Sequence, residues 1–155
     1  MTTQNSDLSI TENTKNYAMA NHFGGVFLAL LSFTLPLTLA VTFVPSLIFY
    51  FSTPNDTFLR SNAKNSMNFF LTWAIIYIIT IALITLFLVL TFTSDSFASI
   101  SLPSMANKAS IFGVIVGSVF YLIHIVFLIV CGTIAAVKAK QGELFVYPLS
   151  FKFFK

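Results

Sequence analysis

The sequence predicts an all-α membrane protein, a polytopic bundle of apolar helices. Hydrophobic residues make up 57% of the 155-residue chain and charged residues only 8%, and the mean hydropathy is +0.89. Soluble domains carry roughly 25% charged residues. Three stretches contain no Asp, Glu, Lys or Arg, namely residues 16–55, 65–94 and 109–137. Since a helix needs about 20 apolar residues to cross the hydrocarbon of a bilayer, each stretch is long enough to span a membrane.

Composition divides the chain into three parts. Residues 1–16 are rich in Thr, Asn and Ser and lack the basic start and cleavage site of a secretory signal, so we expect a disordered polar tail that is not cleaved. Residues 17–143 form the transmembrane helical domain. Residues 144–155 combine aromatic residues with Lys152 and Lys155, which is typical of a tail lying in the membrane interface.

The first apolar stretch, residues 17–51, is long for one crossing and short for two, with Pro36 near its middle. Proline breaks a helix interior, so one kinked helix and a hairpin of two short helices both fit. Cytoplasmic segments are enriched in Lys and Arg, and a hairpin leaves only Lys108 on the far side. We therefore favour four helices with the first two in a short hairpin and both termini cytoplasmic. Three transmembrane helices are the alternative.

Residues 68–92 and 109–137 are the two clearest spans, and residues 93–108 are expected to face away from the cytoplasm. Asn68 opens the first of these spans and is predicted to make a polar contact between helices. In the second span, small and polar residues recur every three or four positions, which predicts a face that packs inward or against a partner. This face consists of Gly113, Gly117, Tyr121, His124 and Cys131.

The end of the last helix is marked by Lys138, Lys140 and Gly142. Cations complement the negative end of a helix, and glycine supplies the left-handed residue that terminates it. Tyr147 and Pro148 follow in the aromatic tail, which we expect to anchor the helix end at the depth of the lipid headgroups.

Several classes of function are excluded by what the sequence lacks. Cys131 is the single cysteine and only two histidines are present, so the spacing supports neither a disulfide framework nor a metal site. No glycine-rich phosphate loop is followed by Lys-Ser or Lys-Thr, and the scattered cations form no face for nucleic acid. We expect no enzymatic activity and no cofactor.

Three stretches carry a family resemblance. "KAKQGELFVYPLSF" (138–151) resembles the closing signature of a family of small bacterial membrane proteins, domain of unknown function four-eight-seven-zero. "VPSLIFYFSTPNDTFLRSNAKNSMNF" (44–69) and "HFGGVFLALLSFTLPL" (22–37) resemble its middle and opening. That family is similar to the Tic-twenty proteins, four-helix subunits of the chloroplast inner-envelope translocon. The resemblance implies a multi-helix bundle in the inner (plasma) membrane of a bacterium, with a connection to protein translocation.

The predicted function is that of a small integral membrane protein, in contact with the lipid bilayer, whose helices associate with one another in a homo-oligomer or with a larger membrane assembly. The alternative is an oligomeric small pore or carrier. Its weakness is that the spans contain no charged groups to line a path.

Overall fold

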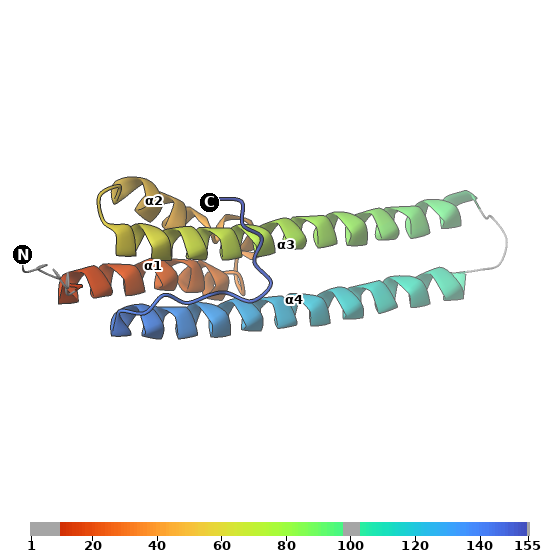
Figure 1. Ribbon diagram of the computed structural model, residues 1–155. Helices are drawn as coiled ribbons and strands as arrows, with labels where there is room; N and C mark the ends of the chain where they lie inside the picture. Colours follow the sequence, from red (N-terminus) through yellow and green to blue (C-terminus); the bar gives the residue numbers. More distant parts are fainter. Residues whose placement is uncertain (1–9, 98–102, 155) are drawn as a thin grey trace, which may run out of the picture.

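The computed structural model describes residues 10–97 and 103–154, and within them the protein is all-helical, without strands. The elements are α1 (Glu12–Leu31), a 3₁₀ helix η1 (Pro36–Val41), α2 (Val44–Ser52), α3 (Thr57–Phe97) and α4 (Pro103–Gln141), shown in Figure 1. The prediction of an all-α protein with four α-helices is confirmed.

Helix α1 begins earlier than the sequence predicts. Thr11 caps it, because the Thr11 hydroxyl accepts a hydrogen bond from the Thr14 backbone N–H at 3.2 Å. The negative charge of Glu12 in the first turn also stabilises the positive end of the helix dipole. Residues 12–16, expected in the polar tail, are therefore helical. Of the rest of that expected disordered tail, residues 10 and 11 precede the helix, and residues 1–9 lie outside the described residues.

Helices α1 and α2 form an antiparallel hairpin, and the chain turns at η1 (Figure 1). Pro36 opens η1, where its missing N–H and fixed φ are tolerated. The turn lies about halfway along α3 and α4: the Tyr121 hydroxyl donates to the Ser32 carbonyl, and Leu39 packs in the same core cluster as Tyr77. The hairpin thus covers only one half of the long helix pair.

Threonine hydroxyls hold the turn of the hairpin together. Thr34 and Thr42 each donate to the carbonyl three residues earlier, at 2.9 and 3.0 Å. Thr38 reaches further: its hydroxyl lies 2.9 Å from the Leu28 carbonyl at the end of α1 as well as 2.8 Å from the local Leu35 carbonyl, and its one proton is shared between them. In an apolar environment backbone carbonyls must find donors within the protein, and these hydroxyls supply them.

The longer reach of Thr38 leads to a testable prediction. Replacing Thr38 by Val keeps the shape but removes the donor that ties η1 to α1, so we expect a loss of about 1 kcal/mol of stability. Thr34→Val, which removes only a local bond, should cost less. Thermal unfolding in detergent measures both, and equal effects would show that the Thr38 bond does not close the turn.

Helices α3 and α4 are far longer than a bilayer requires. Their 41 and 39 residues extend roughly 60 Å each at 1.5 Å per residue, against about 30 Å of hydrocarbon. Both contain segments long and apolar enough to span a membrane, Thr57–Leu90 and Ile111–Gln141, yet only 11% and 22% of their most apolar windows are buried. A core helix of a soluble protein would be mostly buried, so these exposed apolar faces are suited to lipid.

Helices approach closely at three glycines: a Cβ added to Gly24 of α1 would lie 2.6 Å from Cβ of Pro45 on α2, and two other glycines are closer still to their neighbours. A Cβ added to Gly25 of α1 would lie 2.3 Å from Cε2 of Phe70 on α3, and one added to Gly132 of α4 would lie 2.4 Å from Cγ2 of Val26 on α1. Neither position leaves room for a methyl group. Helix α1 therefore lies tightly against both long helices.

Helix α4 ends at Gln141, and Gly142 follows with a φ of +85°. The Gly142 N–H donates to the Ala139 carbonyl and the Glu143 N–H to the Lys138 carbonyl, the paired bonds of a Schellman cap. Beyond it the tail, drawn in dark blue in Figure 1, runs back along α4 and then crosses onto α3.

Candidate functional site

Buried polar side chains gather where the carboxyl-terminal tail crosses the helices. We call this set the polar cluster: His22 of α1, Ser46 of α2, Asn62 and Ser66 of α3, and Tyr147 of the tail, each at most 6% exposed. Four segments distant in sequence thus contribute to one site.

Hydrogen bonds through His22 connect α1, α3 and the tail. The Asn62 amide Nδ2 donates to the Phe58 carbonyl at 3.0 Å, which leaves Oδ1 as the acceptor facing His22 Nε2, also at 3.0 Å. Nε2 must therefore carry the proton, and Nδ1 accepts from the Tyr147 hydroxyl at 2.8 Å. The two bonds fit neutral His22 protonated on Nε2, and a proton on Nδ1 would remove the acceptor of the Tyr147 hydroxyl proton.

A second bond joins the hairpin to α3. The hydroxyls of Ser46 and Ser66 lie 2.7 Å apart and are both fully buried. Since an unpaired hydroxyl in such a position would lose free energy, this pair fixes how α2 sits on α3.

The tail is fastened to one face of α3. Tyr147 stacks on Phe69, with ring centroids 4.2 Å apart and planes inclined by 15°.

Hydrogen bonds from α3 side chains to the backbone of the tail add to this stack. Asn68 forms a reciprocal pair with Phe154: its amide donates to the Phe154 carbonyl and accepts from the Phe154 N–H, both at 3.0 Å. Two further bonds come from the same face, Asn65 Nδ2 to the Phe145 carbonyl at 3.4 Å and the Phe151 N–H to Thr72 Oγ1 at 3.0 Å.

The electrostatics of the cluster favour uncharged groups. Burial lowers the pKa of His22 to about 4, with the bond to Asn62 acting against the shift, and burial raises the pKa of Tyr147. Both ring nitrogens of His22 are engaged, so no lone pair is left to act as a base. The arrangement is suited to holding the tail rather than to catalysis.

Acidification should therefore loosen the tail. With a folded pKa near 4 against 6.5 for the free side chain, the unfolded form binds more protons between these values, so stability is full above pH 6.5 and declines as the pH falls toward 4. We expect the unfolding temperature in detergent to drop by several degrees across this window. His22→Gln, which cannot titrate, should show a flatter profile, and parallel profiles would contradict the assignment.

The predicted packing face of α4 lies toward α3 at its two glycines and at His124, and toward the hairpin at Tyr121. A Cβ on Gly113 would lie 3.2 Å from Phe87, and one on Gly117 would lie 3.1 Å from Ile84. Tyr121 bonds to the hairpin, and His124 and Cys131 are buried. His124 packs edge-on against Trp73, with centroids 5.0 Å apart, and among the described residues neither of its ring nitrogens has a hydrogen-bond partner.

The other predicted residues lie at the end of the bundle where α1 begins and α4 ends. Lys138 pairs with Glu143 at 2.7 Å, and Lys140 pairs with Glu12 at the start of α1. Pro148 leads into a turn in which Leu149 has a φ of +51°. Tyr147, expected among lipid headgroups, is instead buried against α3, because its ring and hydroxyl both find partners inside the protein.

His22, Asn62, Ser66 and Ser46 were not predicted as site residues. A signal for part of the set is present, since polar residues occur at 62, 65, 66, 68 and 72 with helical spacing just where the apolar run begins. In the described part of the chain no three His, Cys, Asp or Glu side chains lie close enough to hold a metal ion.

Comparison with protein families corrects the resemblance drawn from the sequence. The model of the magnetosome magnetite crystal formation protein family (MamF/MmsF) matches residues 13–154. The Tic-twenty-like assignment, with the domain of unknown function four-eight-seven-zero, is wrong. That assignment rested on three short runs, all within the matched range. Residues 138–151 form the end of α4 and the tail, and residues 22–37 form part of α1 and the start of the hairpin turn. Neither the curated proteins nor the solved structures include a match to this chain.

Proposed function

The chain belongs to the magnetosome magnetite crystal formation protein family, and from that premise we propose that it is an integral protein of the magnetosome membrane. In this proposal it takes part in magnetite crystal formation without enzymatic activity, through contacts of its helices with one another and with other membrane proteins. The expected bacterial inner membrane is thereby narrowed to that of the magnetosome.

The observation that carries the proposal is the exposure of apolar side chains on the halves of α3 and α4 that extend beyond the hairpin. Many large apolar residues there are more than half exposed, among them Ile78, Leu83, Leu86, Phe112 and Ile123. Such a continuous apolar surface is unstable in water and stable in lipid. A surface that is stable in lipid agrees with membership in a family of magnetosome proteins.

We further propose two membrane spans and one re-entrant hairpin. Tyr77, beside the hairpin turn, lies nine residues beyond Asn68, where the apolar part of α3 begins, which is about 14 Å of helix. That distance is about half of the hydrocarbon thickness. The hairpin then enters the bilayer and returns to the same side, and neither the four-span nor the three-span alternative is needed.

The distribution of Lys and Arg supports placing one end of the bundle, where α1 and α3 begin and α4 ends, on the cytoplasmic side. The start of α1, the start of α3 and the end of α4 lie together at that end (Figure 1), which brings Lys15, Arg60, Lys64, Lys138 and Lys140 to one side. Excess of Lys and Arg is typical of the cytoplasmic side.

The proposal is tested in a magnetite-forming bacterium. The tagged chain should co-purify with magnetosome membranes and resist extraction by carbonate, and its deletion should change the size distribution of crystals measured by electron microscopy. A chain that stays in the soluble fraction, or a deletion strain with unaltered crystals, would contradict it.

A further inference from the structure

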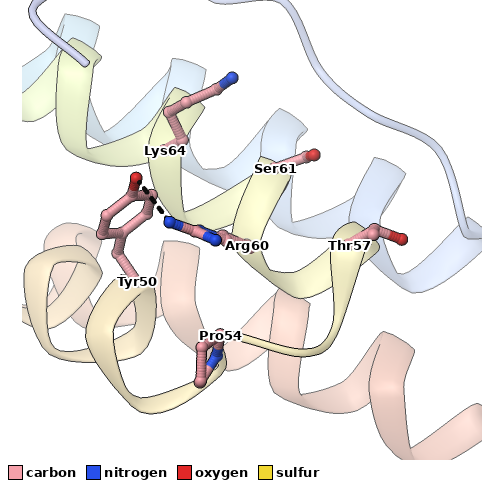
Figure 2. A pocket seen from close by; sticks show the side chains of 6 residues that line it. All are labelled: Tyr50, Pro54, Thr57, Arg60, Ser61 and Lys64. Atoms are coloured by element: carbon pink, nitrogen blue, oxygen red, sulfur yellow. Dashed lines mark hydrogen bonds between the residues drawn. The ribbon is translucent and has the colours of Figure 1, made fainter. Parts of the chain in front are cut away.

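A surface cavity of about 350 Å³ lies between the end of α2 and the first turns of α3. Figure 2 shows the six residues that line it, which are Tyr50, Pro54, Thr57, Arg60, Ser61 and Lys64. We call it the basic pocket. Two cations, three hydroxyl groups and no carboxylate line it, which is the donor set that recognises a phosphate group.

The two cations of the basic pocket have no carboxylate partner among the described residues. The ion pairs within the described residues lie outside the pocket and join Lys138 to Glu143 and Lys140 to Glu12. The nearest acid in sequence, Asp56, is turned away: its Oδ1 accepts from the Leu59 N–H at 2.8 Å, and its Oδ2 accepts from the Thr14 hydroxyl at 3.5 Å. The positive charge of the pocket is therefore not neutralised from within.

Arg60 is held in place by Tyr50. Its Nη2 donates to the Tyr50 hydroxyl at 3.2 Å, drawn as the dashed line in Figure 2, and its guanidinium carbon lies 4.9 Å from the centre of the Tyr50 ring. This contact uses one of five guanidinium N–H groups. The others remain available for the two-pronged binding of phosphate oxygens that arginine favours.

The edge of the pocket nearest the apolar run, at Lys64, lies at the level expected for lipid headgroups. Lys64 precedes Phe69, near the start of the apolar run, by five residues, or about 7 Å of helix, and each headgroup layer is roughly 5–8 Å thick. On α2, the neighbouring Ile48 and Phe51 expose most of their apolar surface. A phospholipid could thus place its headgroup in the pocket and its chains against α2.

We propose that the basic pocket is a binding site for a phosphate group, carried by an anionic phospholipid or free in the cytoplasm. Arg60 and Lys64 supply the charge, and the hydroxyls of Thr57 and Ser61 supply further hydrogen bonds. The depth argument rests on the proposed membrane orientation, whereas recognition of phosphate by the pocket does not.

Two arms of one experiment distinguish the sources. In the first, the full chain in phosphatidylcholine nanodiscs with a minor fraction of phosphatidylglycerol is released into the gas phase, and retained lipid is identified by native mass spectrometry. In the second, lipid-free protein in detergent is titrated with inorganic phosphate by calorimetry. Selective retention of phosphatidylglycerol indicates the lipid source, and binding of inorganic phosphate alone indicates the free one.

The double variant Arg60→Gln/Lys64→Gln should weaken whichever binding is found by about 30-fold, the effect of two cations near a membrane surface. Lys138→Gln/Lys140→Gln removes the same charge outside the pocket and should change it little. Ser61→Asp, which adds a carboxylate to the lining, should also weaken binding. Absence of binding in both arms, or equal loss in the pocket and control variants, would overturn the proposal. Unfolding temperatures in pure phosphatidylcholine verify that each variant is folded.

Discussion

Replacement of Tyr147 by Ala is expected to release the carboxyl-terminal tail and to destabilise the protein by roughly 3–5 kcal/mol, the range for loss of a buried aromatic ring. The ring stacks on Phe69 at 4.2 Å, and its hydroxyl donates to His22 at 2.8 Å. Alanine removes both contacts and leaves His22 Nδ1 without a donor in a buried site. Few other side chains of the tail are so enclosed.

Trypsin cleavage after Lys152 measures tail release, and thermal unfolding in detergent measures stability. Val146→Ala is the matched control, because Val146 is adjacent in sequence yet 83% exposed, and it should behave like the unaltered chain. Tyr147→Phe keeps the stacked ring and loses only the hydroxyl, so its cost should be smaller, about 1–3 kcal/mol. Cleavage at the same rate in the Tyr147→Ala protein would show that the tail is not held by the polar cluster.

Gly25→Ala is expected to cause the largest packing defect in the helix bundle. The added methyl group would lie 2.3 to 2.8 Å from three ring atoms of Phe70, and Phe70 is fully buried, so the ring cannot move aside without displacing its neighbours. Overpacking of this kind costs typically 1–3 kcal/mol and sometimes more. We expect a clear loss of folded, monodisperse protein in detergent.

Gly117→Ala is the comparison, because its methyl group would meet only the end of the flexible Ile84 side chain, at 3.1 Å. It should cost less than about 1 kcal/mol. Phe70→Leu should partly restore Gly25→Ala by making room for the methyl group. If Gly25→Ala and Gly117→Ala were tolerated equally well, α1 would not lie as closely on α3 as the structure places it.

The two long helices and the break at Pro36 could be predicted from sequence, because both depend on local properties. A run of apolar residues without charges must be helical in lipid, and proline interrupts a helix wherever it occurs in the interior. The depth of the hairpin could not be predicted in the same way. Residues 17–51 have a length between one and two crossings, and long-range contacts, of Ser32 with Tyr121 and of Leu39 with the core cluster of Tyr77, show where the turn lies.

The polar cluster depends on pairings between distant residues. His22 and Tyr147 are 125 residues apart, and Asn68 and Phe154 are 86 apart. No local pattern relates such residues, so an aromatic tail with lysines was interpreted as an interfacial anchor. The same holds for the glycines with the closest contacts, Gly25 and Gly132. Each is in contact with another helix, and a G-x-x-x-G spacing within one span does not reveal which glycine meets such a neighbour.

The depth of Leu37 in the bilayer tests most directly whether the chain combines two spans with a re-entrant hairpin. Leu37 lies in η1 at the hairpin turn, and its side chain is 82% exposed. A nitroxide label at Leu37→Cys, in a Cys131→Ala background reconstituted in liposomes, reports depth through its collision rates with oxygen and with a water-soluble nickel chelate. We predict high oxygen and low nickel accessibility, which would place the label near the bilayer centre. A label at Leu37 as accessible to the nickel chelate as one at Val146→Cys would contradict the re-entrant hairpin.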